Sequence, residues 1–307
     1  MRRHEWLERI RRLDPDRDFH EIYRISSAHE FPWDTVQALG FALYRTYAVP
    51  GIGRLLAGTG EFTGRTQKRY DDTALILDAV LEHGFDSVPG REAIRRMNRM
   101  HRHYDIPDDD FRYVLATFVV VPKRWLDDYG WRPYSEHEVR AATNYYRALG
   151  RRMNIPDVPD DYAGFERLLD DYERRHFAFD AGGRAVSDAT LDLFASWYPG
   201  PLGTAMRKAS LCLMDDALRE AFGYPAPSAA LRRAVRSALR LRGRAVRLMP
   251  PRRRPRYARQ NPNVRGYPDG YRIAELGTFP SGCPVLHDEG AERPPRPPVS
   301  GPPGDGR

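Results

Sequence analysis

The sequence predicts an all-α protein built as one large helical domain. Three observations lead to this fold class. Apolar residues recur with the helical period from the N-terminus to about residue 250, and alternating apolar runs long enough for a sheet are scarce. The chain has 307 residues, of which 41% are hydrophobic and 11% aromatic, so it can bury a substantial core and is not a disordered protein.

The expected helices are separated by clear boundary signals. In order they are Gln37–Tyr47, Thr66–His83, Arg91–Tyr104, Phe111–Val121, Val139–Met153, Ala189–Trp197 and Leu202–Phe222. Pro50 follows the first helix, and Gly84 stops the second. Ser135 opens a capping box before the fifth, and Ser187 is expected to start the sixth. The fourth is apolar almost all round, so we expect it at the centre of the domain.

The net charge of +7 is concentrated in one segment. Leu231–Arg265 contains thirteen arginines and no acidic residue, so the rest of the chain carries −6. Leu231, Val235, Leu239 and Val246 give it a partial apolar face. The pattern favours either peripheral contact with an anionic membrane or a solvated helix packed on the domain. Aromatic residues for base stacking are nearly absent, so nucleic acid is not expected as a partner.

These patterns divide the chain into three parts: a helical domain at 1–228, an Arg-rich helix and C-terminal extension packed on it at 229–288, and a Pro-rich tail at 289–307 that is expected to be disordered. Cys212 and Cys283 give neither a zinc pattern nor a disulfide framework. The charged N-terminus lacks the apolar core of a signal peptide, and no stretch is apolar enough to span a membrane. We expect a cytoplasmic protein, peripheral at a membrane surface at most.

One histidine lies on the apolar face of an expected helix. The stripe at positions i, i+3, i+7 and i+10 consists of Ile94, Met97, His101 and Tyr104, and the opposite, solvated stripe consists of Arg95, Arg99 and Arg102. His101 therefore points inward and His103 outward. An inward histidine is either a core residue bonded to a backbone carbonyl or an iron ligand.

The preceding helix carries a cation and a hydroxyl at the head of an apolar stripe. Arg69 and Thr73 lie at i and i+4, and Ile76 and Val80 continue the same face. In one interpretation Arg69 snorkels or pairs with Asp72, and Thr73 bonds back to a backbone carbonyl. In the other, both groups lie beside a bound ligand.

Three motifs, in this order, resemble a known family: K-R-Y-x-D-T at Lys68–Thr73, R-M-N-x-x-H at Arg96–His101 followed by Tyr104, and W-x-x-x-Y-x-W-R-P at Trp125–Pro133. The family is the large helical one that includes rubber oxygenase, or latex-clearing protein, and the fungal MpaB-type oxygenases. The similarity runs from about His29-Glu30-Phe31-Pro32 to Pro199, and a weaker echo extends from Gly266-Tyr267 to Gly277-Thr278.

The resemblance implies a b-haem protein whose globin-like helical core encloses the haem. In that case His101 matches the axial iron ligand, and Arg69 and Thr73 match the arginine and threonine on the other haem face. Arg69 would bind a haem propionate or act on the oxygen side. The sequence differs from that of rubber oxygenase at Asp72, where rubber oxygenase has a lysine that can cap the iron. The similarity is therefore closer to the fungal branch.

The sequence thus predicts a haem b-dependent oxygenase that uses dioxygen on an apolar isoprenoid or other olefin, by cleavage of a carbon–carbon double bond or a related oxidation. Its catalytic residues are Arg69, Thr73 and Asp72, and His101 and Arg69 bind the cofactor. Asp72 is either a base or only an ion-pair or dipole partner near the start of its helix. Two alternatives stay open: a membrane-associated haem carrier or sensor, and a haem-independent tailoring enzyme on the same fold.

Overall fold

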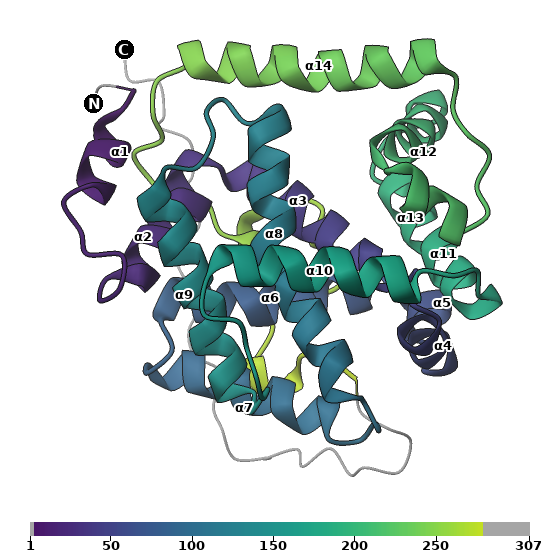
Figure 1. Cartoon of the computed structure of the whole chain (residues 1–307), viewed down its shortest axis with the longest axis horizontal. Coiled ribbons are helices and arrows are strands. Elements are labelled where there is room, and N and C mark those ends of the chain that lie inside the picture. The colour runs from purple at the N-terminus through teal and green to yellow at the C-terminus, as the bar shows by residue number, and fades with distance from the viewer. Residues whose placement is uncertain (1–2, 279–307) are drawn as a thin grey trace, which may run out of the picture.

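The structure, a computed structural model, describes residues 3–278, and within that range every regular element is a helix (Figure 1). The predicted all-α single domain is confirmed. The α-helices are α1 (Glu5–Ile10), α2 (Phe19–Ile25), α3 (Pro32–Thr46), α4 (Pro50–Gly58), α5 (Glu61–Gly64), α6 (Thr66–His83), α7 (Val88–His101), α8 (Asp108–Tyr129), α9 (Glu136–Arg152), α10 (Tyr162–His176), α11 (Ala181–Ser196), α12 (Pro201–Leu213), α13 (Asp216–Ala221) and α14 (Ala229–Leu248). Short turns are η1 (Ser26–Glu30), η2 (Ala258–Gln260) and η3 (Ile273–Glu275).

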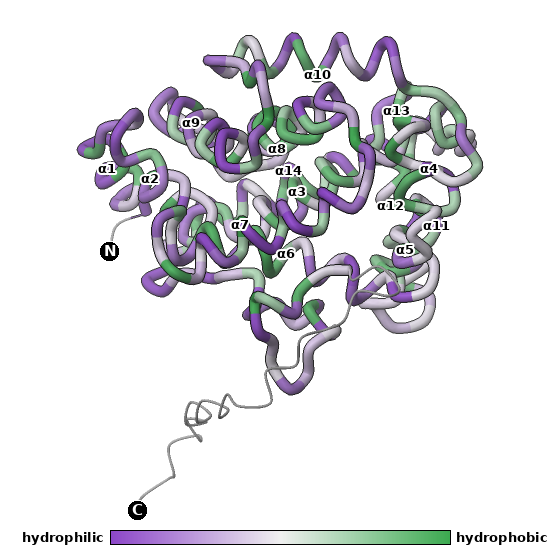
Figure 2. Tube along the Cα trace, turned by 90° about the horizontal axis from the view of Figure 1, so that it is seen from below, coloured by the Kyte–Doolittle hydropathy of each residue, from purple (hydrophilic) through white to green (hydrophobic). Residues whose placement is uncertain are grey.

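Helix α8 forms the centre of the domain. Helices α3, α9, α10 and α14 pack against it, and the main hydrophobic core also includes α6 and α7. Figure 2 shows hydrophobic residues, in green, on α8 and on the inner turns of α3 and α6, while the outer turns of α10 are hydrophilic. The expectation of a central helix at residues 111–121 is therefore correct, because a helix buried on most sides must be apolar on most sides.

Capping groups explain where the best-predicted helices begin and end. Helix α6 has the bounds that the sequence predicts, and Gly84 follows it with a φ of 83° that favours glycine. Ser135 forms the capping box of α9. Ser87 accepts a hydrogen bond from the backbone N–H of Gly90 at 3.0 Å, so α7 begins at Val88, three residues before the predicted start at Arg91. This helix ends at His101, three residues earlier than predicted.

Three other predicted boundaries are wrong. Helix α8 continues through Pro122 to residue 129, because packing on several sides offsets the lost backbone hydrogen bond. Helix α11 starts after its capping residue Asp180, and Ser187, expected as the cap, is buried inside it. The helix expected over Leu202–Phe222 divides into α12 and α13, since Asp215 caps the second.

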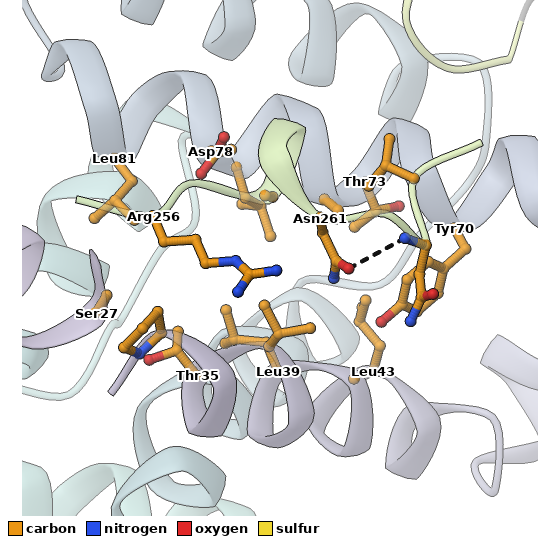
Figure 3. A pocket seen from close by; sticks show the side chains of 18 of the residues that line it. Ser27, Thr35, Leu39, Leu43, Tyr70, Thr73, Asp78, Leu81, Arg256 and Asn261 are labelled. Carbon is orange, nitrogen blue, oxygen red and sulfur yellow. Dashed lines mark hydrogen bonds between the residues drawn. The ribbon is translucent and has the colours of Figure 1, made fainter. Parts of the chain in front are cut away.

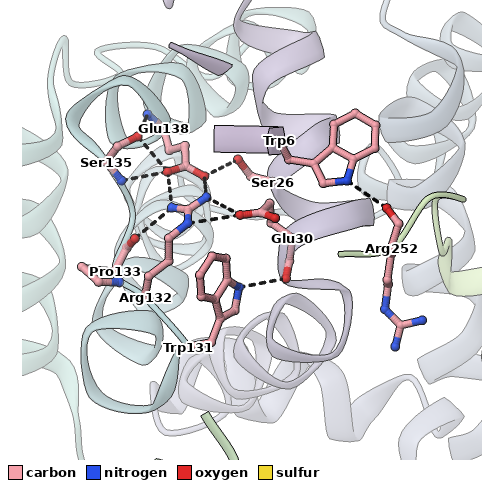
Figure 4. Close-up of polar contacts among 9 residues, drawn as sticks. All are labelled: Trp6, Ser26, Glu30, Trp131, Arg132, Pro133, Ser135, Glu138 and Arg252. Carbon is pink, nitrogen blue, oxygen red and sulfur yellow. Dashed lines mark hydrogen bonds and ion pairs between the residues drawn. The ribbon is translucent and has the colours of Figure 1, made fainter. Parts of the chain in front are cut away.

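A buried ion-pair cluster joins two of the sequence motifs (Figure 4). The guanidinium of Arg132 lies 2.7 Å from a carboxylate oxygen of Glu30 and 2.6 Å from one of Glu138. Ser26 donates to Glu138 at 2.8 Å, and the indole N–H of Trp131 donates to the Glu30 carbonyl at 3.3 Å. Ion pairing and hydrogen bonds offset the desolvation of the two carboxylates. These motif residues therefore hold η1 against α9 and the turn that connects α8 to α9.

The arginine-rich helix α14 packs along one edge of the domain (Figure 1). Gly243 approaches α8 so closely that an added Cβ would lie 2.6 Å from the Tyr129 carbonyl oxygen. Arg242 pairs with Asp34 at 2.7 Å and covers the ring of Trp33 at 3.8 Å. These contacts are the ones expected for a solvated helix packed on the domain.

After α14 the chain returns across the domain, and we call residues 249–278 the C-terminal segment. Its turn η2 packs on α6, and η3 packs on α6 and α7. The predicted tail at 289–307 and the last part of the predicted extension, 279–288, lie outside the described residues. Within the described range, no helix combines the length and apolar character needed to cross a membrane.

Candidate functional site

His101 is the last residue of α7, and its imidazole is turned into the protein. The ring lies edge-on to Phe111 of α8, with 5.2 Å between the ring centroids. Its Nδ1 atom is buried and has no hydrogen-bond partner among residues 3–278. Burial and then the positive charge of Arg69 lower the pKa of His101 to about 4. The imidazole is therefore neutral at neutral pH and keeps a lone pair that could bind a metal.

His103 behaves differently, although it is only two residues away. It follows the end of α7 and is exposed to solvent. The predicted contrast between an inward His101 and an outward His103 is confirmed. Of the two interpretations of His101, the bond to a backbone carbonyl does not occur within the described residues.

Arg69 and Thr73 form one polar unit on α6. A guanidinium N–H of Arg69 donates to the Thr73 hydroxyl, and that hydroxyl donates to the Arg69 carbonyl at 3.3 Å. The guanidinium also lies over the ring of Phe62, 5.1 Å from its centroid. No carboxylate in the described part of the chain pairs with Arg69, so the expected alternative of an Arg69–Asp72 ion pair is wrong. The alternative in which Thr73 bonds back to a carbonyl is correct.

Asp72 lies in a separate cluster that faces the C-terminal segment. Its buried carboxylate is 2.8 Å from Nζ of Lys68 and accepts a hydrogen bond from the Tyr267 hydroxyl. Burial and this carboxylate raise the pKa of Tyr267. Lys68 also donates to the carbonyl of Gly277 at 3.2 Å. Whether Asp72 also acts as a base stays a prediction.

Two other motif residues fasten the same segment. Asp71 accepts hydrogen bonds from the backbone N–H groups of Gly266 at 2.7 Å and Arg265 at 3.0 Å. Arg96 of α7 donates to the carbonyl oxygens of Leu276 at 2.6 Å and Thr278 at 3.0 Å. The weaker similarity near the C-terminus, at residues 266–278, therefore belongs to a segment that binds the first two motifs. The sequence periodicity did not predict these contacts.

A cavity adjoins Thr73. Its volume is about 100 Å³, and it is partly open to solvent. Its main lining residues are Val36, Leu39, Gly40 and Leu43 of α3, Tyr70, Thr73, Ala74, Leu77, Asp78 and Leu81 of α6, and Arg256, Asn261 and Val264 of the C-terminal segment. Sequence reasoning missed it, although Tyr70, Ala74, Leu77 and Leu81 follow one helical stripe of α6.

The described residues fit a bound haem on two counts. His101 offers an imidazole that is neutral and makes no hydrogen bond, and this is the state that an axial ligand requires. Arg69 offers a permanent cation without an acidic partner, which an anionic haem propionate would complement. No three His, Cys, Asp or Glu side chains of the described chain gather as a metal site, but an iron held by a porphyrin needs only one such ligand.

Comparison with known proteins places this helical site in a class of oxygenases. The family described as "ER-bound oxygenase mpaB/B'/Rubber oxygenase, catalytic domain" matches residues 33–248. The chain therefore belongs to the MpaB/rubber oxygenase family and contains its catalytic domain, as the sequence motifs predicted.

Curated relatives come from two Penicillium species. The chain is 31% identical to the ER-bound oxygenase mpaB' of Penicillium brevicompactum over 73% of this chain and 57% of that protein. It is 29% identical to the ER-bound oxygenase mpaB of Penicillium roqueforti over 68% of this chain and 76% of that protein. The match thus covers little more than half the length of the first relative.

Proposed function

We propose that this protein is a haem b-dependent oxygenase that acts on an apolar olefin, such as an isoprenoid chain. The supporting observation is that His101 has a neutral imidazole, without a hydrogen bond among residues 3–278, near the guanidinium of Arg69, which pairs with no carboxylate in the same range. When bound, a haem with one imidazole ligand supplies an iron with a free coordination position for dioxygen. Cleavage of a double bond by dioxygen leaves one oxygen atom on each carbon, as two carbonyl groups, and needs no further electrons.

Each site residue has a role in this proposal. His101 holds the iron. Arg69 presents a permanent cation to a haem propionate or to negative charge on the oxygen side, and Thr73 keeps the guanidinium in place through its hydroxyl. As a base, Asp72 would take up a proton at the carboxylate oxygen that now bonds to Lys68 or to Tyr267.

An absorption spectrum of the purified protein, before and after addition of haemin, tests the proposal. A haem band from five-coordinate iron that responds to dioxygen supports an oxygenase. Six-coordinate haem without oxygen reactivity would instead indicate a carrier or sensor. Turnover of an olefin by a protein that takes up no haem would indicate a haem-independent enzyme.

Arg69→Ala is expected to lower turnover by roughly 100-fold while most of the haem stays bound. A hydrogen-bond donor oriented toward developing negative charge accelerates a reaction by about this factor, whereas the imidazole of His101 would supply most of the haem binding. Thr73→Val should cause a smaller loss, since it removes only the group that orients the guanidinium. Steady-state turnover and the haem-to-protein ratio are measured for both variants.

Arg65→Ala is the matched control, because this arginine lies one turn before Arg69 at the start of α6 and is exposed. It should leave both quantities unchanged. If Arg69→Ala released haem as readily as a variant of His101 does, Arg69 would be a propionate anchor and its oxygen-side role would be wrong.

We also propose that the outer face of α14 contacts an anionic membrane surface. Leu241 and Leu248 are 64% and 88% exposed on this helix. Arg240, Arg244 and Arg247 are exposed beside them and form no ion pair with another described residue. Exposed leucines among unpaired arginines are typical of helices that lie at a lipid interface. The curated relatives are named as ER-bound proteins.

Replacing Arg240, Arg244 and Arg247 together by glutamine should weaken binding to phosphatidylserine-containing vesicles about 100-fold at low salt. Each basic residue near such a surface contributes roughly 1 kcal/mol, and salt screens the attraction. Cosedimentation measures binding. The same triple change at Arg91, Arg95 and Arg99 removes equal charge from exposed positions of α7 and should have little effect. Equal losses in both variants would show that net charge, not α14, governs binding.

A further inference from the structure

The cavity beside Thr73 is a groove between two helices with the C-terminal segment across it. In Figure 3, α3 forms one wall, α6 the other, and the segment carrying Arg256 and Asn261 passes over the groove. Leu39 and Leu43 line the wall on α3, and further leucines line the wall on α6. The groove therefore suits an elongated apolar molecule.

An exposed arginine lies at the open side of this apolar groove. The guanidinium of Arg256 extends over α3 toward the interior of the cavity (Figure 3). The backbone is fixed, because the N–H of Arg256 donates to the carbonyl of Ala28 at 2.9 Å. The guanidinium itself makes no hydrogen bond or ion pair with any residue of the described chain. Arg259, three residues later in the chain, differs in that it forms an ion pair with Glu82 at 2.5 Å.

The carboxyl group in the described lining forms no ion pair with Arg256. This group belongs to Asp78, which accepts a hydrogen bond from the backbone N–H of Arg259 at 3.3 Å. Its pKa is raised to about 6, mainly by burial. Arg256 is thus an exposed cation at the edge of an apolar cavity and forms no ion pair with a residue of the range 3–278.

A second polar group faces the same space. Asn261 points into the cavity, and its Oδ1 atom accepts a hydrogen bond from the backbone N–H of Asn263 at 3.1 Å (Figure 3). That bond directs the amide so that its NH₂ group stays free to donate. The guanidinium of Arg256 offers several donors that suit an oxyanion, and the amide NH₂ of Asn261 offers a further donor nearer to Thr73.

The two polar ends of the groove are separated along α3. Arg256 reaches from the side of Leu81 to a position over Leu39, whereas Asn261, Thr73 and Tyr70 lie at the other end (Figure 3). Thr73 bonds to Arg69, which belongs to the proposed oxygen side. A molecule anchored at Arg256 would therefore extend its apolar chain toward the reacting groups.

We propose that this groove binds an apolar, isoprenoid-type chain with an anionic head group, whose oxyanion is held by Arg256 and whose tail passes Asn261 toward Thr73. The inference rests on the proposed oxygenase function and adds a head-group requirement to it. The head group is an anionic oxygen group, which either a carboxylate or a phosphate would supply.

Binding of three probes with the same fifteen-carbon chain tests the head-group requirement: farnesoic acid, farnesyl monophosphate and farnesol. Calorimetry or quenching of tryptophan fluorescence measures their dissociation constants on the full chain with its haem. The wild-type protein should bind at least one of the two anions about 10-fold or more tightly than the alcohol. Arg256→Gln should remove that preference without changing the affinity for farnesol.

Arg254→Gln is the charge-matched control, since Arg254 is exposed on the same segment and does not line the groove. It should keep the preference. Equal affinity of the wild type for all three probes, or a preference that survives in Arg256→Gln, would overturn the proposal. The better-bound anion identifies the source as a carboxylate or a phosphate.

Gly40 provides an independent test of where the chain lies. A Cβ added there would meet only the Tyr70 hydroxyl at 3.5 Å and Phe194 at 4.0 Å, so alanine fits at ordinary contact distance. Gly40→Ala should leave binding of all probes nearly unchanged. Gly40→Leu adds bulk at a lining position of the groove and should weaken binding of the acid and the alcohol alike, while circular dichroism confirms the fold. Unchanged binding in Gly40→Leu would place the chain elsewhere and overturn the proposal.

These measurements separate the inference from the function on which it rests. A protein that shows the Arg256-dependent preference but no oxygenase activity keeps the binding site and rejects the proposed reaction. An active oxygenase without any head-group preference does the opposite.

Discussion

His101→Ala is expected to lose haem, while His103→Ala retains it. Only His101 offers a buried, neutral ring nitrogen without a hydrogen bond, and His103 is exposed beyond the helix end. Loss of a group that merely supports a metal ligand costs roughly 10- to 100-fold in metal affinity, so loss of the ligand should cost more. The haem-to-protein ratio, measured from the Soret band during a haemin titration, gives the result.

Two further measurements make this test specific for ligation. Far-UV circular dichroism shows whether the alanine variants are folded, which matters because His101 packs against Phe111 in the core. In His101→Gly, added imidazole should restore a haem band, because the free base can occupy the space of the missing ring. Equal haem loss in the two alanine variants, or equal retention, would reject His101 as the ligand.

Local patterns were enough to predict this part of the site. The spacing of Ile94, Met97 and His101 depends only on the helical period, and the bounds of α6 follow from its own stop signal at Gly84. The pairing of Arg69 with Thr73 is also local, at i and i+4. For these features the sequence contains all the partners within one or two turns.

The partners of Asp72 could not be predicted in the same way. Its hydrogen bond to Tyr267 joins residues 195 positions apart, and a side chain in an irregular segment leaves no periodic signal. The loop that carries Arg256 and Asn261 has the same difficulty, so the groove could not be seen from α6 alone. Burial also overrode local signals, as at Ser187, whose hydroxyl bonds to Tyr224 at 2.7 Å inside α11 instead of capping it.

A chain that ends at Leu248 is expected to lose its cooperative fold, although it keeps the whole region matched by the family. This truncation removes the C-terminal segment. Asp71 and Asp78 lose backbone N–H donors, Asp72 loses the hydrogen bond from the Tyr267 hydroxyl, and Arg96 loses its carbonyl acceptors. Each buried polar group left unsatisfied costs roughly 1–3 kcal/mol, and more when it is charged. Asp71 and Asp72 keep Gln67 and Lys68 as partners, but the losses at the four groups together still reach a magnitude similar to the lower end of the about 5–15 kcal/mol that stabilises a typical domain.

The matched control is a chain that ends at Thr278, which keeps every described contact of the segment. Thermal and urea unfolding followed by circular dichroism should show one cooperative transition for the control, and a broad transition or none for the shorter chain. Tyr267→Phe is the reference for the loss of one contact. It removes a single hydrogen bond and should lower the unfolding free energy by only about 1–3 kcal/mol. If the chain ending at Leu248 unfolded as cooperatively and at nearly the same temperature as the control, the carboxylates of α6 would not depend on the C-terminal segment. The acidic pair at Asp71 and Asp72 would then need another explanation, and the base proposed at Asp72 would be the first to test.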